Sequence, residues 1–167
     1  ACTGAGVGPT FIDAVIGISK AYTTRVGSGP FPTELHGELG EELRSKGGEF
    51  GATTGRPRRC GWLDMVGLLH AVRVNGLTSI ALTKLDVLAG LDSIKICTGY
   101  RLDGEMLDTV PGRRGALEAV QPVYETLPGF AEDIETMKTW EELPENARAY
   151  VRRVEQLAGV PISLLSV

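Results

Sequence analysis

The sequence has little cysteine and no long apolar run, and both absences narrow the class of protein. Its three cysteines, Cys2, Cys60 and Cys97, are odd in number and widely spaced, which argues against a disulfide framework and against a CxxC metal site. We expect reduced thiols, as in a cytoplasmic protein. No apolar run approaches the ~18 residues that a membrane span needs, and no basic-then-apolar signal peptide opens the chain. The sequence therefore predicts no membrane partner.

A surplus of positive charge is also missing. The chain has 17 Lys and Arg against 21 Asp and Glu, a net charge of −4, and aromatic residues make up only 6% of it. These numbers disfavour nucleic acid as a partner, because proteins that bind it usually carry basic patches with aromatics for stacking. Hydrophobic residues make up 43% of the 167 residues, so the chain can bury a core as one domain or as a large piece of a bigger one.

The polar, mobile ends that natural domains usually have are absent as well. The chain opens on the glycine-rich run ACTGAGVGP and stops on the apolar run VPISLLSV, so we expect a piece of a longer protein. The segment Thr3–Pro9 (TGAGVGP) fits neither GxGxxG between a strand and a helix nor GxxxxGK[ST]. We interpret it as a flexible turn that leads into the first helix.

The apolar pattern predicts helices that alternate with short strands, and hence an α/β fold. Apolar spacing and capping residues predict helices at 11–22, at 33–42 with Thr33 as its cap, at 63–74 as a buried helix ended by Asn75-Gly76, and from Pro144 to Gly159. Short β-prone runs predict strands at 79–83, 93–102, 121–127 and 160–166, with a hairpin turn at Asp103-Gly104 that leads to 105–110. Residues 23–32 have the composition of a loop.

The run GATTGRPRR, residues 51–59, is the first candidate site. Gly51 and Gly55 allow the backbone to approach a ligand closely and to take positive φ, and Thr53 and Thr54 add hydroxyl donors. Arginine side chains bind carboxylate and phosphate groups through a planar, two-pronged array of N–H donors. The run therefore favours a site for a small anion that carries carboxylates or phosphates.

Two other interpretations of the arginines stay open. In an extended stretch Arg56 and Arg58 point the same way and Arg59 points the opposite way. All three arginines could simply form a solvated basic turn that binds no ligand. They could also pair with the many acids nearby. A third interpretation, binding of nucleic acid by these arginines, is disfavoured by the net charge of −4.

The tetrapeptide TKLD, residues 83–86, follows a predicted buried strand and is the second candidate site. In GTP-binding proteins an Asp in this position accepts hydrogen bonds from the guanine ring and its amine, while the Lys stem packs over the base. The carboxyl ends of strands are also where α/β folds bind ligands. His36 and His70 occur in no metal-binding or catalytic pattern, so we interpret both as structural residues.

Taken together, the motifs resemble the adenylosuccinate synthetase family in their order and rough spacing. The matching segments are GPFPTEL (29–35), EFGATTGRPRRCGWLD (49–64), LTKLDVLAGL (82–91), YETLPG (124–129) and RVEQLAGVPISLLSV (153–167). The resemblance covers essentially the whole chain, so residues 1–167 are expected to be the C-terminal portion of such an enzyme. It implies the P-loop-like nucleotide-binding architecture of this family, incomplete in this chain.

The resemblance also implies a reaction. The family joins IMP to L-aspartate with GTP and forms adenylosuccinate, GDP and phosphate on the way to AMP. GTP phosphorylates the purine 6-oxygen, and the aspartate amine then displaces that phosphate. The implied partners are the small molecules IMP, L-aspartate and GTP as co-substrate, with Mg²⁺ as the cofactor of the full enzyme and a homodimer as its assembly.

The site residues implied by the resemblance fall on the two candidate sites and on the C-terminus. The aspartate loop corresponds to Ala52, Thr53, Thr54, Gly55, Arg56, Pro57 and Arg58. Arg56 and Val26 correspond to contacts with IMP, and the GTP contacts correspond to Arg58, Lys84, Leu85, Asp86, Ser166 and Val167. Pro57 departs from the pattern, because some relatives carry another arginine there.

The chain lacks the parts of the family that carry the chemistry. The glycine-rich phosphate loop, with the Asp that serves as base and Mg²⁺ ligand, is missing, and so is the catalytic His. We therefore assign no catalytic residue and no metal ligand, and we expect the isolated chain to be inactive. The alternative interpretation is a truncated, non-catalytic domain with a structural or interaction role.

Overall fold

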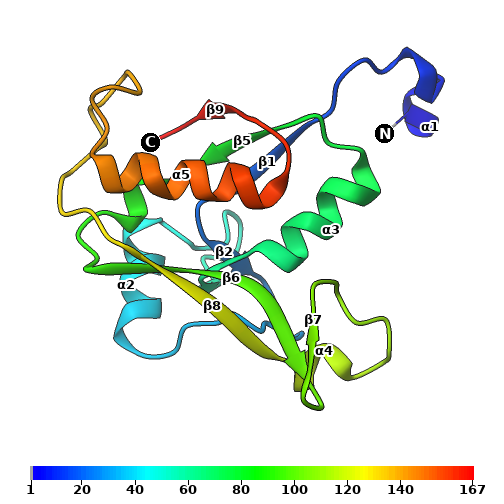
Figure 1. The fold of residues 1–167 in the computed structure, drawn as a ribbon, viewed down its shortest axis with the longest axis horizontal. Helices are drawn as coiled ribbons and strands as arrows, with labels where there is room; N and C mark the ends of the chain where they lie inside the picture. The colour runs from blue at the N-terminus through cyan, green and yellow to red at the C-terminus, as the bar shows by residue number, and fades with distance from the viewer. Residues whose placement is uncertain (1) are drawn as a thin grey trace.

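A parallel sheet forms the part of the fold from which the TKLD segment emerges. In this computed structural model, which describes residues 2–167, the sheet has the order β1 (Ile16–Lys20), β5 (Ser79–Thr83) and β9 (Ile162–Leu165). The long helix α5 (Glu145–Ala158) lies across it in Figure 1. Side chains of α5 share one hydrophobic core with Ile80 of β5, which fixes the position of the sheet.

A second, mixed sheet is built around the ten-residue strand β6 (Ser93–Leu102). That strand pairs in parallel with β4 (Leu63–Asp64) and antiparallel with β7 (Glu105–Leu107) and β8 (Gln121–Pro128). The turn between β6 and β7 has positive φ at Asp103 and Gly104, as the sequence predicts for this hairpin.

A short antiparallel pair, β2 (Thr23–Arg25) and β3 (Arg59–Gly61), joins the regions that contain Val26 and the arginines. The remaining elements are helices: α1 (Cys2–Ala5), the 3-10 turn Pro9–Phe11, α2 (Glu38–Lys46), α3 (Met65–Asn75), the 3-10 turn Asp86–Leu88 and α4 (Ala116–Ala119). Figure 1 shows α1 projecting away from the body of the molecule.

Much of the predicted secondary structure is confirmed, and the α/β class with it. The strands predicted at 79–83 and 93–102 are β5 and β6, and the apolar stripe of α5 is buried at Ala147, Tyr150, Val151 and Val154. Helix α3 ends at Gly76 in the left-handed conformation, and Gly159 ends α5 in the same way. The three cysteines are free thiols, with Cys60 and Cys97 buried.

The helix predicted at 11–22 is wrong. Residues 16–20 form strand β1, which pairs in parallel with all five residues of β5. The apolar residues of this segment also alternate, and the β-branched Ile16 and Ile18 fit a strand better than a helix. Likewise the segment Thr3–Pro9 is not a plain turn, because α1 covers part of it.

Two further predictions need correction. The helix predicted at 33–42 begins only at Glu38, because Glu34 bridges to Gly61 and Gly37 takes a positive φ before the helix. The helix predicted at 63–74 begins only at Met65, because Leu63–Asp64 is strand β4, and it is buried only at its start, while Val74 near its end is exposed. The predicted loop at 23–32 contains strand β2 in its first three residues.

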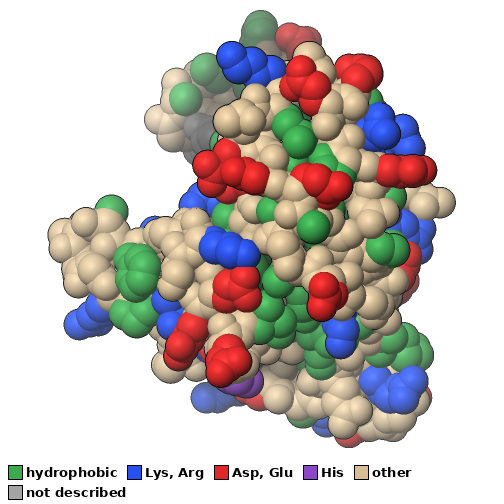
Figure 2. Space-filling model, turned by 90° about the vertical axis from the view of Figure 1, so that its left-hand side faces the viewer, with side chains coloured by type: hydrophobic (Ala, Val, Ile, Leu, Met, Phe, Trp, Pro, Cys, Tyr) green, Lys and Arg blue, Asp and Glu red, His purple; other side chains and the backbone are tan. Residues whose placement is uncertain are grey.

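The surface is mixed in character. Figure 2 shows one face on which acidic and basic side chains are interspersed around apolar ones. Several large apolar side chains are exposed, and the most exposed of them, Ile18 on β1, has 81% of its surface accessible. Within residues 2–167, the helices are all too short or too polar to cross a bilayer.

Candidate functional site

The arginine loop, residues 49–59, is a turn closed by its own backbone. Phe50 and Pro57 form an antiparallel bridge, and the N–H of Gly51 donates to the carbonyl of Arg56 at 2.9 Å. Gly55 takes a φ of 63°, and its N–H donates to the carbonyl of Gly51 at 2.8 Å. The residues at the tip, 52–57, are exposed. The loop therefore presents Thr53, Thr54 and Arg56 to solvent from a backbone that is closed by its own hydrogen bonds.

The arginines of this loop have different surroundings. Arg56 is exposed, and within the described residues its side chain has no ion-pair partner. The Nη1 of Arg58 lies 2.8 Å from Glu49 Oε2, whereas the Nη2 of Arg59 lies 2.5 Å from Glu34 Oε2. Pairing with local acids, which the sequence left open, thus occurs for two of the three arginines.

Glu49, at the base of the arginine loop, is a completely buried carboxylate surrounded by donors. Its Oε1 accepts from Lys20 Nζ and from the Tyr22 hydroxyl, each at 2.6 Å, and its Oε2 accepts from Arg58. Its exposed fraction is 0%. The sequence alone assigns no role to Glu49; the only signal there is a lone acid that precedes three arginines.

The titration of this cluster follows from its contacts. Burial alone would raise the pKa of Glu49, but hydrogen bonds from Lys20, Tyr22 and Arg58 outweigh it and hold the pKa at about 2. Burial and the hydrogen bond to Glu49 raise the pKa of Tyr22. Glu49 is therefore charged and Tyr22 neutral at neutral pH, so the hydroxyl donates to the carboxylate.

The TKLD segment leaves β5 through an unusual backbone conformation. Lys84 has a φ of 60°, which is uncommon for a residue with a side chain. Its Nζ donates to the carbonyl of Gly47 and lies 3.8 Å from Glu49 Oε1. The arginine loop and the TKLD segment therefore meet at Glu49, through Arg58 from one side and Lys84 from the other.

The C-terminal residues lie beside the TKLD segment. The N–H of Leu85 lies 3.5 Å from the carbonyl of Ser166, and the N–H of Ser166 donates to the carbonyl of Leu82 at 2.8 Å. Leu85 itself is buried. The structure therefore brings together Lys84, Leu85 and Ser166, three of the residues predicted to bind GTP.

Asp86 and Val167 line different hollows. Asp86 lines a concavity of about 300 Å³ together with Lys46, Gly90, Asp133 and other residues, and this hollow does not include the arginine loop. Val167 lines a smaller hollow of about 110 Å³ beside Trp140. The two predicted sites thus adjoin at Glu49, but their outer residues do not line one common pocket in this chain.

Val26 lies in a loop that Arg59 holds in place. The side chain of Val26 is 73% exposed. Arg59 Nη1 donates to the carbonyls of Gly27 and Gly29, at 2.9 Å and 2.6 Å. The loop with Val26 is therefore fastened to strand β3, which follows the arginine loop.

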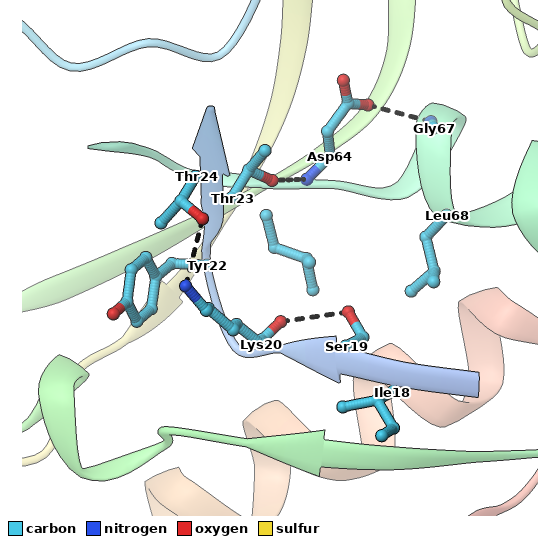
Figure 3. Close-up of a pocket in the computed structure, with 10 residues that line it drawn as sticks. Ile18, Ser19, Lys20, Tyr22, Thr23, Thr24, Asp64, Gly67 and Leu68 are labelled. Carbon is cyan, nitrogen blue, oxygen red and sulfur yellow. Dashed lines mark hydrogen bonds between the residues drawn. The ribbon is translucent and has the colours of Figure 1, made fainter. Parts of the chain in front are cut away.

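A concavity of about 350 Å³, lined by polar and apolar side chains, lies next to the Glu49 cluster and was not foreseen from the sequence (Figure 3). Lys20, Tyr22 and Thr24 line one end, and Asp64 lies at the other with the first turn of α3. Burial raises the pKa of Asp64, and hydrogen bonds from Tyr100 and from two N–H groups of α3 offset this only in part. Asp64 thus serves as the N-terminal cap of α3.

The two histidines lie apart from these clusters. The His36 side chain is 84% exposed, with its Nε2 4.0 Å from Glu34, and His70 is exposed on α3. Among residues 2–167, no three His, Cys, Asp or Glu side chains come together in a way that could hold a metal ion.

Comparison with known proteins gives the family. The family model described as adenylosuccinate synthetase matches residues 1–167. The chain is 66% identical over 166 residues to the adenylosuccinate synthetase of Pelobacter propionicus, with 99% of the chain and 39% of that protein covered. It is 62% identical over 167 residues to the enzyme of Moorella thermoacetica, with 100% and 39% covered.

A solved structure agrees in fold as well as in sequence. The fully ligated adenylosuccinate synthetase of Plasmodium falciparum superposes with a TM-score of 0.95 at 43% identity, over 98% of this chain and 40% of that one. The chain thus spans about 39% of the length of the curated relatives it matches. With its motifs, its α/β fold and its full-length match to the family model, this chain belongs to the adenylosuccinate synthetase family, a family of enzymes.

Proposed function

We propose that residues 1–167 are the C-terminal portion of an enzyme that ligates IMP and L-aspartate with GTP. In this proposal the arginine loop holds aspartate and the TKLD segment reads guanine. The observation that carries it is the meeting of the two segments at Glu49, where Arg58 and Lys84 approach the same carboxylate. An amino dicarboxylic acid and a purine triphosphate can then be held next to each other.

The arginine loop has the donors that a dicarboxylate needs. Arg56 is exposed and has no ion-pair partner within residues 2–167, so its planar fork is available for a carboxylate or for IMP. The hydroxyls of Thr53 and Thr54 stand on the same exposed turn. A fixed backbone lowers the entropy lost when a ligand orders these side chains, which favours binding.

The TKLD segment has the groups that a guanine base needs. The Asp86 carboxylate can accept from the ring N–H and the exocyclic amine, and it lines a concavity large enough for part of a nucleotide. Lys84 and Ser166 flank the same strand ends, next to Leu85. This arrangement follows the rule that α/β folds bind ligands at the carboxyl ends of their strands.

The remaining chemistry is assigned to parts of the enzyme outside this chain. Phosphoryl transfer of this kind generally needs Mg²⁺ and preorganised charge around the moving group. The described residues offer no fit for Mg²⁺, because no three potential ligands converge among them. We propose that the metal ligands and the catalytic acid and base belong to the rest of a cytoplasmic, homodimeric enzyme.

The aspartate assignment is tested by Arg56→Leu in a full-length enzyme that carries this segment. Grafting the segment into the Pelobacter propionicus enzyme, which is 66% identical over it, would supply such a protein. We expect the KM for aspartate to rise about a hundredfold, because a bidentate charged contact is lost, and the KM for GTP to change far less. Equal rises in both would reject the assignment.

The guanine assignment is tested by Asp86→Asn in the same protein. An amide in place of the carboxylate exchanges an acceptor for a donor, so GTP should bind at least about tenfold more weakly and xanthosine triphosphate more tightly. Direct binding measurements with both nucleotides separate this result from a general loss of folding. Unchanged selectivity between the two bases would count against the guanine role.

A second candidate is a non-catalytic domain, favoured by the chain's coverage of only 39% of its relatives. The assay of the chain on its own separates the two. We expect no turnover of IMP, aspartate and GTP without the rest of the enzyme. Turnover by these 167 residues alone would contradict our assignment of the chemistry to other parts.

A further inference from the structure

The Glu49 cluster contains more positive than negative charge. Within 4 Å of its single carboxylate lie the ammonium groups of Lys20 and Lys84 and the guanidinium of Arg58, with the neutral Tyr22 hydroxyl beside them. One carboxylate neutralises one cation, so a formal surplus of two positive charges remains. The surplus favours an anion as the group that completes the cluster.

The cations are accessible while the carboxylate is not. The side chain of Glu49 has 0% exposure, whereas those of Lys20, Arg58 and Lys84 are 26%, 32% and 41% exposed. A ligand can therefore reach the three cations but cannot reach Glu49. The carboxylate acts on a ligand only through the side chains that it holds.

Arg58 and Lys84 are held in place by contacts that leave some of their N–H donors available to a ligand. Among the described residues Arg58 uses one of its five side-chain N–H donors on Glu49, so the rest of its fork is open to a ligand oxygen. Lys84 is held at its head by the Gly47 carbonyl and at its backbone by a left-handed conformation. Both side chains are thus oriented before a ligand arrives, which lowers the cost of binding.

We propose that Glu49 is a positioning residue, which fixes Arg58 of the arginine loop and Lys84 of the TKLD segment in one orientation toward their anionic ligands. This inference rests on the proposed function, in which those ligands are aspartate and GTP. Glu49 touches no substrate. Because it contacts both segments, it ties the geometry of one substrate site to that of the other.

The test is Glu49→Gln in the full-length graft described above. Gln keeps the size of the side chain but removes its charge and turns one acceptor into a donor that faces cations. We expect the KM for aspartate and the KM for GTP to rise together by about tenfold or more, because misplacement of a binding group by about 1 Å is costly. The KM for IMP should stay within about twofold.

Two further variants complete the experiment. Glu34→Gln removes the carboxylate that pairs with Arg59, the residue next to Arg58, and should leave the KM values for aspartate and GTP within about twofold. Glu49→Asp keeps the charge on a shorter side chain and should recover most of the loss in aspartate and GTP binding. If Glu49→Gln does not fold, Glu49→Asp is the test. It must then raise the KM for aspartate and the KM for GTP by about threefold or more, relative to any change in the KM for IMP.

The outcomes are distinct. The inference is overturned if Glu49→Gln folds and its KM values for aspartate and GTP stay within about twofold of those of the parent. It is also overturned if the KM values for all three substrates rise equally, which would indicate a purely structural role. Arg58→Leu is measured in parallel. If Arg58→Leu changes neither KM, the proposed function fails; if it raises them and Glu49→Gln does not, only the positioning role fails.

Discussion

Arg58 and Arg59 are neighbours in the chain, yet each contacts a carboxylate of a different kind. Arg58 shares the fully buried Glu49 with Lys20 and the Tyr22 hydroxyl. Arg59 holds Glu34 through two hydrogen bonds of 2.8 Å and 2.5 Å in a pair that is 28% and 16% exposed. One arginine belongs to a network, and the other forms a separate clamp.

The difference shows how one basic run can serve two purposes. The Arg59–Glu34 clamp holds strand β3 to the loop after β2, since Arg59 also binds the carbonyls of Gly27 and Gly29. The Glu49 network joins strand β1, the arginine loop and the TKLD segment. Removal of the carboxylate should therefore lower the free energy of unfolding more in the network than in the clamp, because several charges depend on that one carboxylate.

Replacement of each carboxylate by leucine gives the largest expected contrast. Glu49→Leu leaves three partly buried cations without their counter-charge and should lower the free energy of unfolding by about 3 kcal/mol. Glu34→Leu breaks a partly exposed pair and should cost about 1 kcal/mol. Denaturant unfolding of both variants in the full-length graft measures the difference. Equal losses would remove the distinction between network and clamp.

A glycine beside Glu49 and a glycine whose carbonyl binds Arg59 sharpen the same comparison. A Cβ at Gly47 would meet the Tyr22 hydroxyl, the Leu43 carbonyl at 2.9 Å and Glu49 Cγ at 3.1 Å. Gly47→Ala should therefore cost about 2 kcal/mol, since the backbone of α2 cannot move aside easily. At Gly29 the three atoms nearest to the added methyl all belong to the Arg25 guanidinium, the flexible end of a side chain. Gly29→Ala should lower the free energy of unfolding by less than about 0.5 kcal/mol, as measured by thermal denaturation. A loss as large as that of Gly47→Ala would refute the view that the rigidity of the neighbouring atoms sets the difference.

The pH dependence of stability should differ between the parent protein and Glu49→Gln. The pKa of Glu49 is lowered from 4.5 to about 2 in the folded state, so its contribution to stability is present above pH 4.5 and is lost as the pH falls toward 2. Glu49→Gln should therefore lose less stability over this range than the parent protein does. Unfolding curves at several pH values between 5 and 2 measure this; superimposable losses would show that Glu49 gains no such stabilisation.

A small effect is also expected from Arg59→Lys. A lysine keeps the charge opposite Glu34 but cannot form both hydrogen bonds together with the contacts to Gly27 and Gly29. Stability should fall by less than about 1 kcal/mol. Because the loop with Val26 loosens, the KM for IMP should rise about threefold while that for aspartate stays constant. Initial-rate kinetics with each substrate varied in turn check this, and an effect on aspartate alone would contradict it.

Part of the fold could be predicted from the sequence because it depends on neighbouring residues. Asp103-Gly104 and Asn75-Gly76 are turn-forming pairs, and the structure has positive φ at Asp103, Gly104 and Gly76. Strand β5 is a short apolar run, which is why its position was predicted correctly. The roles of the arginine loop and of Asp86 were predicted by resemblance and stay predictions.

Other parts could not be predicted, because the same residues fit two structures. Residues 11–22 have apolar side chains at helical spacing, yet Ile16–Lys20 is a strand, since β5 offers a parallel partner more than sixty positions away. The role of Glu49 cannot be predicted from the sequence, because its partners Lys20 and Lys84 are distant along the chain and its burial depends on the fold. Nothing local marks a glutamate as completely buried.

The sequence by itself determined the family motifs, the turns and the presence of arginines beside a hydroxyl-rich loop, because each of these depends on residues that are close together in the chain. Only the tertiary structure decided that β1 is a strand and that Glu49 collects Lys20, Tyr22, Arg58 and Lys84. The physical reason is that strand pairing and the burial of a charge are long-range. Both are stable only when partners from distant segments replace the water that each group has lost.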